Sequence, residues 1–272
     1  MSLLLRDELR IVFSPEQVAI VHLGRGRKPE VVARHVVACV PPAASEAPWA
    51  KALESLETGL RTMAGANRDA QVVLSNHFVR YALVPWRYLI SDKDEEQAFI
   101  RHCFSQTYGA GAQQWAMRIS PGGYGETQVA CAIDQGLLDG LENVMRAHGL
   151  RLVSLQPYFM AMFNQWRLQL QGSVVWFVVA EPGRLCVALL KQGCWQILRT
   201  IRVGNDWLDA LKKLLEREYL ISESGAERGK VYLYAPGSSP ATVLPGWALH
   251  QLDKNLDAAP HSGMHYSMSM SE

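Results

Sequence analysis

The sequence predicts an α/β protein made of two related halves, and three observations lead to this prediction. Segments rich in β-branched residues alternate along the chain with segments that carry apolar residues at helical spacing. A pattern of three short strands joined by tight turns occurs twice, and a helix follows each copy. Hydrophobic residues make up 49% of the composition and charged residues 19%, which excludes a disordered chain and supplies a large core.

The first copy of the strand pattern occupies residues 11–37. Its three strands are expected where Pro15 and Gly24 interrupt runs rich in valine and isoleucine, because these two residue types favour turns. A helix is expected next, at residues 49–63, where five apolar side chains recur at helical spacing. These side chains are Trp49, Leu53, Leu56, Leu60 and Met63.

The second copy occupies residues 176–203 and again contains a proline turn. Aligning Pro15 with Pro182 requires a shift of 182 − 15 = 167 residues, and the same shift superimposes three further apolar pairs. These pairs are Val12 with Val179, Val18 with Leu185, and Leu23 with Leu190. A helix is expected to follow at residues 206–219. Two βββα units predict a duplication, and two unrelated meanders are the alternative because meanders are common.

The stretch between the two copies mixes strands and helices. The elements expected there and after the second copy are hairpins at 71–83 and 115–133, helices at 92–108, 134–148 and 158–170, and strands at 151–155 and 230–234. Gly149 is expected to end the second of these helices. We therefore predict four parts, which are an N-terminal half at 1–170, a subdomain inserted into it at about 71–155, a C-terminal half at 171–257 and a flexible tail at 258–272.

Charge and cysteine usage exclude several classes of function. The 27 Lys and Arg residues balance 26 Asp and Glu residues without a basic cluster, which argues against nucleic-acid binding. The longest aliphatic run, at 174–180, is far shorter than the roughly 20 residues of a membrane-spanning helix, and the N-terminus resembles no signal peptide. Five cysteines without a Cys-x-x-Cys pair indicate buried thiols rather than disulfides or a zinc site. We expect a cytoplasmic protein without a metal.

No short motif supports an enzyme of a common class. Gly-x-Ser-x-Gly, His-Glu-x-x-His and Gly-x-x-x-x-Gly-Lys are all absent from the sequence. The glycines at 122–125 indicate the tip of a hairpin rather than a phosphate cradle, because strand residues follow them. Among the tryptophans, Trp247 is the best candidate for a surface anchor, since it follows the turn-forming Pro245 and Gly246.

Two segments carry a resemblance to a known fold. Residues 72–85 read as strand, turn, strand and proline, and residues 128–155 read as strand, amphipathic helix, glycine stop and return strand. Together with the two βββα units, they make the chain resemble the actin-like, or ribonuclease H-like, ATPase fold. Within that fold it is most similar to the bacterial pilus and secretion assembly group of PilM, the cytoplasmic part of GspL, and MshI. The resemblance spans roughly residues 9–252 and implies two halves that enclose a nucleotide cleft.

The phosphate-binding turns of that fold are the place where the sequence departs from the resemblance. The Asp, Gly and Lys of the first turn fall on Val12, Ser14 and Ala19, and the Asp-x-Gly of the second turn falls on Val179, Ala180 and Glu181. The adenosine-side Gly-Gly corresponds at best to Ala235-Pro236-Gly237. The Asp organises Mg²⁺, the Gly lets backbone approach phosphate and the Lys neutralises it. We therefore expect a cleft that has lost ordinary Mg-ATP binding.

The resemblance implies a function without catalysis or cofactor. We expect a cytoplasmic scaffold of a bacterial type IV pilus or type II secretion-like assembly machine that binds the cytoplasmic segment of an inner-membrane partner. Peripheral attachment to the inner membrane and self-association are both compatible with it. One alternative is an ATP-binding ATPase or kinase whose atypical pocket uses Ser14, Gln17, Gly183 and Arg184. The other is an adaptor of the same fold that is unrelated to pili.

Overall fold

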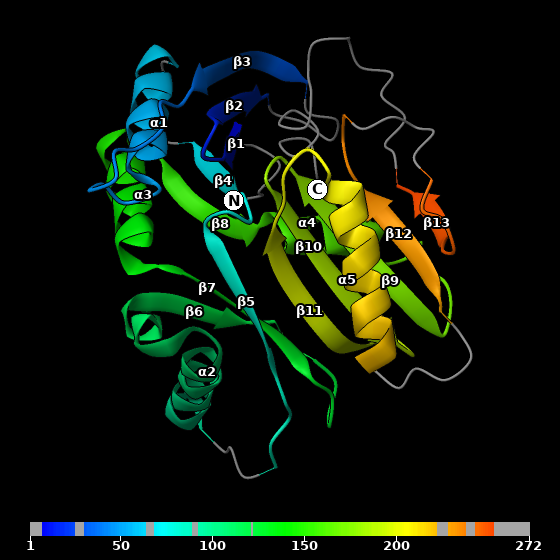
Figure 1. Ribbon diagram of the computed structural model, residues 1–272. Helices are drawn as coiled ribbons and strands as arrows, with labels where there is room; N and C mark the ends of the chain where they lie inside the picture. The colour runs from blue at the N-terminus through cyan, green and yellow to red at the C-terminus, as the bar shows by residue number, and fades with distance from the viewer. Residues whose placement is uncertain are drawn as a thin grey trace. The chain divides into compact units, whose positions relative to one another are not determined.

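The computed structural model describes residues 7–24, 30–63, 68–88, 92–120, 122–221, 228–237 and 243–252 (Figure 1). These residues group into two compact units. Among the described residues, the first unit contains those up to Val79 and Ile133–Ala161, and the second contains Arg80–Ala132 and those from Met162 to Leu252. The tail expected at residues 258–272 lies outside the described residues. No helix among the described residues is long and apolar enough to span a membrane.

The first unit is built on a five-stranded sheet with the order β3-β2-β1-β4-β8. Its strands are β1 (Glu8–Phe13), β2 (Gln17–Leu23), β3 (Val31–Ala38), β4 (Asp69–Leu74) and β8 (Arg151–Pro157). The β1-β2-β3 meander is antiparallel, whereas β1, β4 and β8 run parallel to one another. Helix α1 (Ala50–Thr62) connects β3 to β4, and α3 (Gln135–Ala147) leads into β8. Gly149 has φ 66°, which confirms the predicted glycine stop of α3.

The second unit contains a five-stranded sheet with the equivalent order β11-β10-β9-β12-β13. Its strands are β9 (Val174–Glu181), β10 (Arg184–Lys191), β11 (Cys194–Arg202), β12 (Lys230–Tyr234) and β13 (Ala248–Gln251). The meander is again antiparallel, and β9, β12 and β13 are parallel. Helix α5 (Trp207–Ile221) connects β11 to β12 as α1 connects β3 to β4. The α/β class and the two βββα units are therefore confirmed.

Strand register confirms the alignment of the two copies. Phe13 pairs with Val18 in the β1–β2 hairpin, and Ala180 pairs with Leu185 in the β9–β10 hairpin. Both members of the second pair lie 167 positions after their counterparts, since 180 − 13 and 185 − 18 are both 167. The positions assigned to the two turns therefore correspond in three dimensions as well as in sequence.

A third sheet, of three strands, has the order β5-β7-β6. It consists of β5 (Val79–Val84), β6 (Trp115–Ile119) and β7 (Gln128–Asp134), and it packs with α2 (Lys93–Tyr108) and the 3₁₀ helix η2 (Gly109–Gln114). The hairpin expected at 115–133 is confirmed, because β6 and β7 are neighbours. Helix α2 begins at the expected place, where the Asp92 carboxylate accepts two backbone N–H bonds of 2.8 Å.

The hairpin expected at 71–83 is wrong. Strand β4 pairs with β1 and β8 in the first sheet, while β5 pairs with β7 in the third. The alternating side chains of β4 at Ala70, Val72 and Leu74 are buried, which suits a central strand with neighbours on both sides. The inserted subdomain expected at about 71–155 contains β4, α3 and β8, which group with the first unit, whereas Arg80–Ala132 groups with the second.

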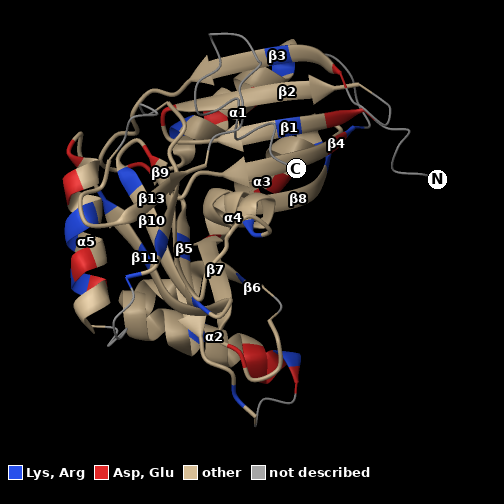
Figure 2. Cartoon of the chain, turned by 90° about the vertical axis from the view of Figure 1, so that its right-hand side faces the viewer, with Lys and Arg blue, Asp and Glu red and all other residues tan. Residues whose placement is uncertain are grey.

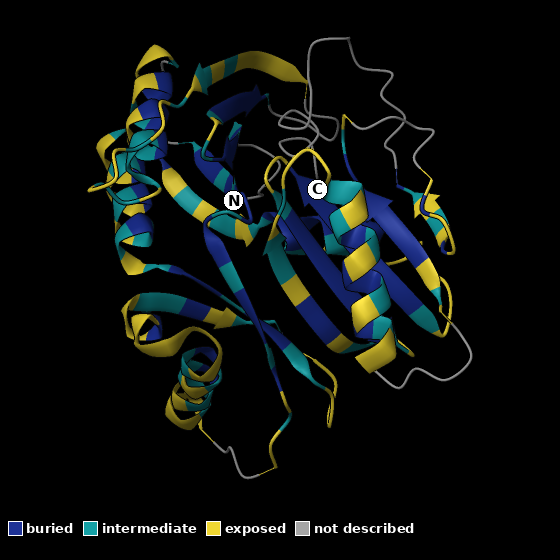
Figure 3. Ribbon diagram, in the orientation of Figure 1, coloured by how far each residue is buried: buried dark blue, intermediate teal, exposed yellow. Residues whose placement is uncertain are grey.

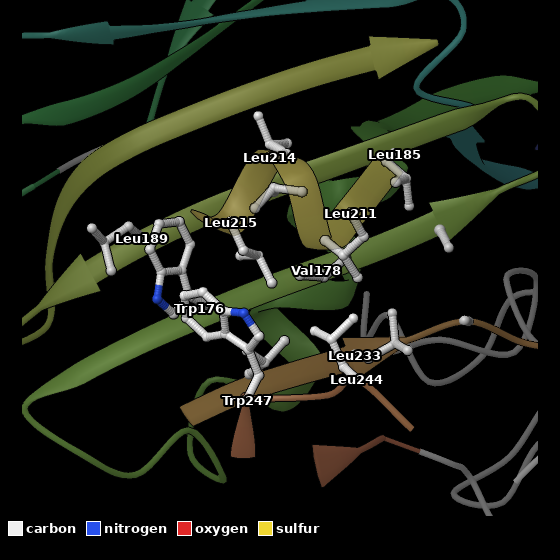
Figure 4. Close-up of a cluster of buried hydrophobic side chains, with 14 of the residues drawn as sticks. Trp176, Val178, Leu185, Leu189, Leu211, Leu214, Leu215, Leu233, Leu244 and Trp247 are labelled. Atoms are coloured by element: carbon white, nitrogen blue, oxygen red, sulfur yellow. The ribbon is translucent and has the colours of Figure 1, made fainter. Parts of the chain in front are cut away.

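The core of the second sheet lies between the sheet and α5 (Figure 4). Fully buried leucines of α5, Leu211 and Leu215, face Trp176 and Val178 of β9. Trp247 also belongs to this core and meets the Trp176 ring edge to face at 5.9 Å. Its expected role as a surface anchor is therefore wrong, because the turn before it directs the indole inward. Helix α4 (Tyr158–Trp166) ends four residues before the expected limit of 170.

Candidate functional site

The β1–β2 turn is closed by its own serine. Ser14 is buried, and its hydroxyl donates a hydrogen bond of 2.7 Å to the Gln17 carbonyl oxygen. The backbone N–H of Ser14 donates to the same oxygen, and the N–H of Gln17 donates back to the Ser14 hydroxyl at 3.2 Å. Two predicted site residues thus bond to each other.

Two neighbouring segments, just after β3 and β4, donate hydrogen bonds to carbonyl oxygens at this turn. The Cys39 N–H donates to the Glu16 carbonyl oxygen at 2.8 Å, and the Ser75 N–H donates to the Phe13 carbonyl oxygen at 2.9 Å. A phosphate-binding turn presents free backbone N–H groups to the anion. Here the N–H groups of Ser14 and Gln17 are used inside the turn, and Pro15 has none.

Apolar side chains stand at the positions to which the resemblance assigns the charged groups of a nucleotide-binding turn. Val12 and Ala19 form a register pair across β1 and β2, and both are fully buried. Val179, the counterpart of Val12 in β9, is fully buried as well. A valine has no atom that can bind Mg²⁺ or its water. In the described part of the chain, no three His, Cys, Asp or Glu side chains gather as metal ligands.

The β9–β10 turn is held by different residues. Gly183 has φ 73°, a left-handed conformation that glycine adopts without steric cost, and its carbonyl oxygen accepts the Val203 N–H at 3.1 Å. Glu181 and Arg184 pair across the turn, and Glu181 is buried. The resemblance assigns Glu181 to the position of the phosphate-turn glycine, where a buried acid would repel a phosphate.

Arg184 gives the second turn a positive charge in a partly buried place. Burial lowers the pKa of its guanidinium, and the positive charges of Arg202 and Arg80 lower it further. Arg202 lies directly across from Arg184 in the β10–β11 register. The Arg184 Nε atom is buried without a hydrogen-bond partner among the described residues. The positive charge of Arg184 can attract an anion.

Cys186, two residues after Arg184 in β10, is no nucleophile. Complete burial raises the pKa of its thiol, and its Sγ lies 3.5 Å from the Thr200 hydroxyl. Nucleophilic cysteines are thiolates in partly exposed, electropositive places. The thiol is therefore part of the core.

The predicted site residues form two separate pairs. Ser14 and Gln17 share one turn in the first unit, and Gly183 and Arg184 share the other turn in the second unit. Their assignment to a nucleotide stays a prediction. The third expected motif, at 235–237, follows β12, and Gly237 has φ 86° there.

Sequence reasoning missed a buried polar group beside the first turn. Ser75 and Asn76 are buried at the carboxyl end of β4, where the Asn76 side-chain oxygen accepts the Phe159 N–H at 3.1 Å and so caps α4. Polar residues at the carboxyl ends of parallel strands are the signal that could have found them, because ligand sites of open α/β sheets lie there. The expected hairpin at 71–83 hid this signal.

Comparison with known proteins identifies the fold. The PilM-PilN type IV pilus biogenesis complex matches with a TM-score of 0.62 and 17% identity, over 90% of this chain and 88% of that chain. The cytoplasmic domain of EpsL, an inner-membrane component of the type II secretion system of Vibrio cholerae, matches with a TM-score of 0.60 and 13% identity, over 92% and 90% of the two chains.

A third solved structure carries the fold in its description. It is a Bacteroides thetaiotaomicron protein with an actin-like ATPase fold and unknown function, with a TM-score of 0.57 and 9% identity over 88% of this chain and 84% of that one. No family model and no curated protein matches the sequence. The chain therefore has the actin-like ATPase fold, which confirms the fold expected from its resemblance.

Proposed function

We propose that this protein is a non-catalytic cytoplasmic scaffold of a type IV pilus or type II secretion-like assembly machine, and that it binds the cytoplasmic segment of an inner-membrane partner. The observation that carries the proposal is the extent of the structural likeness. The PilM-PilN complex and the EpsL cytoplasmic domain each match about nine tenths of this chain and of their own. Both belong, by description, to pilus or secretion assemblies.

The two turns support a role without ATP hydrolysis. Mg-ATP binding needs a carboxylate near the metal and free N–H groups near phosphate. The resemblance assigns the carboxylate positions to Val12 and Val179, which are buried, and the Ser14 and Gln17 N–H groups are occupied. Recognition of a partner peptide requires none of this chemistry, since main-chain bonds and side-chain pockets suffice.

Two measurements test the proposal. The full chain is titrated with ATP by calorimetry with and without Mg²⁺, and micromolar Mg-dependent binding would refute the non-catalytic assignment. It is also co-expressed with the inner-membrane proteins encoded beside its gene. Co-purification that depends on a partner's cytoplasmic segment supports the scaffold, whereas neighbours unrelated to pili or secretion favour the free-standing adaptor.

An ATP-binding protein with an atypical pocket is the second candidate, and one observation favours it. Arg184 and Arg202 place two guanidinium groups on neighbouring strands at the second turn. Their charge could replace a metal in holding an anion. Substituting Ser14→Ala together with Arg184→Met abolishes nucleotide turnover if this candidate is correct. Unchanged turnover in that variant eliminates it.

A further inference from the structure

Two arginines stand opposite each other on neighbouring strands of the second sheet. Arg184 begins β10 and Arg202 ends β11, and the two are partners in the strand register. Directly opposed residues of antiparallel strands have their Cβ atoms about 5 Å apart, and like charges at such positions destabilise a sheet. Arg184 and Arg202, called the arginine pair below, therefore need a compensating negative charge.

The arginine pair lies on the face of the sheet that is turned away from α5. The neighbouring residues Leu185 and Ile201 pack in the core beneath α5, and successive side chains of a strand point to opposite faces. Arg184 is partly buried on the other face, whereas Arg202 is exposed. Figure 3 shows that β11 is more exposed than β10 beside it. The arginine pair is therefore open to solvent on the side of Arg202.

A third arginine of the same unit adds its charge to this place. Arg80 of β5 belongs to the second unit, and its guanidinium lies over the Trp115 ring, 5.7 Å from the ring centre. The pKa of Arg184 is lowered first by burial and then by the charges of Arg202 and Arg80, so Arg80 is within electrostatic reach of the arginine pair. Among the described residues, Glu181 is the one carboxylate that acts on Arg184, and its influence is the weakest.

The guanidinium of Arg184 also has a hydrogen-bond donor that the fold does not use. Its Nε atom is buried without a partner in the described part of the chain, and a buried donor without an acceptor costs free energy. A guanidinium presents its donors in a rigid fork that matches the oxygens of a phosphate. Three guanidinium groups and one carboxylate leave a net charge of 3 − 1 = +2 here, which complements the charge of about −1.5 to −2 on a phosphate group. The unused donor and the surplus of positive charge both indicate an anionic ligand.

We propose that the arginine pair, with Arg80 beside it, binds the phosphate group of a small molecule without a metal ion. Arg184 supplies its unused Nε–H from the buried side, and Arg202 closes the site from the solvent side. The three guanidinium groups outweigh the repulsion from Glu181. This chemistry uses side chains of the strands, whereas a phosphate-binding turn uses backbone N–H groups. The inference does not rest on the proposed function, because a scaffold that hydrolyses no ATP can still bind a phosphate compound.

The first experiment titrates the full chain by calorimetry with pyrophosphate and with ATP, both without Mg²⁺ and at constant ionic strength. We expect both to bind with a dissociation constant below about 1 mM, and Arg184→Met and Arg202→Met each to weaken pyrophosphate binding roughly tenfold or more. Arg167→Met is the matched control, because Arg167 is exposed and its loss removes the same charge. Absence of pyrophosphate binding, or an equal loss in all three variants, overturns the proposal. Binding of ATP alone also overturns it, because recognition then needs the nucleoside.

The second experiment separates a binding role of Arg184 from a structural one. In phosphate-free buffer Arg184→Met should unfold at the same temperature as the wild type or higher, because it removes a buried donor without an acceptor and a repulsion between like charges. Pyrophosphate should raise the unfolding temperature of the wild type and leave that of the variant unchanged, since a ligand stabilises only a fold that binds it. A variant less stable than the wild type without the anion shows that the fold itself uses the guanidinium, and this overturns the proposal. Mg²⁺ is absent throughout, so the result is separate from the Mg-dependent ATP binding that tests the non-catalytic assignment.

Discussion

The β1–β2 turn and the β9–β10 turn occupy the same place in two copies of one fold, yet different groups hold them. A serine hydroxyl closes the first by bonding to Gln17, whereas the left-handed Gly183 and the Glu181–Arg184 pair shape the second. Strand order and register are the same in both copies. The duplication has thus kept its backbone, which depends on many apolar positions, while single side chains in the turns diverged. Val12 and Val179, to which the resemblance assigns the two phosphate-turn carboxylates, are buried in both copies, but the groups that hold the two turns differ.

A second contrast lies in how each copy pairs a buried carboxylate. Asp69 of β4 receives two hydrogen bonds, of 2.9 and 2.7 Å, from one guanidinium, Arg151 of β8. Glu218 of α5 instead receives bonds from two different arginines, Arg199 and Arg217, at 3.4 and 2.6 Å. The first pair joins two parallel strands, and the second fastens a helix to the edge strand β11. Figure 2 shows that α5 carries both acidic and basic residues.

The largest expected effect concerns the helices that cover the two sheets. Leu56 of α1 and Leu211 of α5 are both fully buried. We expect Leu56→Ala and Leu211→Ala each to lower the free energy of unfolding by about 2–5 kcal/mol, since each leaves a cavity in its core. Urea denaturation followed by circular dichroism measures the loss. The control is Leu220→Ala on the exposed side of α5, which should change stability by no more than about 0.5 kcal/mol. A small loss for only one leucine would show that the two halves are packed unequally.

The next largest effect concerns the buried carboxylates. Glu218→Gln should lower the free energy of unfolding by about 1–3 kcal/mol, because the buried amide loses its charge-assisted bonds and adds N–H groups without acceptors. Glu216→Gln is the control, since Glu216 lies exposed on the same helix with Lys212 at 4.0 Å, and a pair of this kind contributes under about 1 kcal/mol. Asp69→Asn should also destabilise, by breaking the two-bond pair in the first sheet. Equal denaturation midpoints for Glu218→Gln and Glu216→Gln would contradict the structural role of Glu218.

A smaller effect separates the two turns. Ser14→Ala should cost about 1–2 kcal/mol, because the Gln17 N–H loses its acceptor in a part-buried turn. Gly183→Ala should cost about 1 kcal/mol through strain, because alanine disfavours positive φ. Gly111→Ala is the control for the glycine, since a Cβ there meets nothing within 4 Å and φ is not positive. If Ser14→Ala were neutral in thermal unfolding, the hydroxyl would not be what closes the first turn.

Local signals explain what can be predicted from the sequence. Pro15, Pro182 and the periodic leucines predict both βββα units, and the shift between the two prolines is enough to align the two turns. The bonds made there could not be predicted, because the contact of Ser14 with Gln17 and the approach of Arg202 to Arg184 depend on turn geometry and on strand pairing. A one-dimensional pattern says little about either.

Contacts between residues that lie far apart in the sequence explain the errors of the sequence-based predictions. The turn at Ser75 and Asn76 shows only that the chain changes direction, so it suggests a hairpin between strands that belong to different sheets. Strand β13 escapes prediction because its four residues alternate without a strong apolar face. The residues that precede Trp247 in the sequence suggested a surface position. Its contacts in the core, such as Trp176, lie far away along the chain, so the sequence around Trp247 does not reveal them.

The smallest expected effect is the pH dependence that a largely buried thiol adds to the third sheet. Burial raises the pKa of Cys131, in β7 of the third sheet, to about 11 from its ordinary value of 9.0. Between these two values the folded chain holds a proton that the unfolded chain releases, so the stabilisation is complete below pH 9 and is lost as pH rises through 11.

We therefore expect Cys131→Ala to remove part of the alkaline destabilisation. Between pH 8 and pH 10 the wild type should lose at most about 1 kcal/mol more than the variant, because one pKa unit corresponds to about 1.4 kcal/mol and the thiol is partly exposed. The midpoints of urea denaturation at the two pH values measure the difference. Below pH 8 we expect the Cys131 thiol to contribute nothing to the pH dependence of the free energy of unfolding. Cys194→Ala, in edge strand β11, is the comparison from the second sheet. Parallel pH curves for wild type and Cys131→Ala would mean that the Cys131 thiol ionises in the folded chain as readily as in the unfolded one.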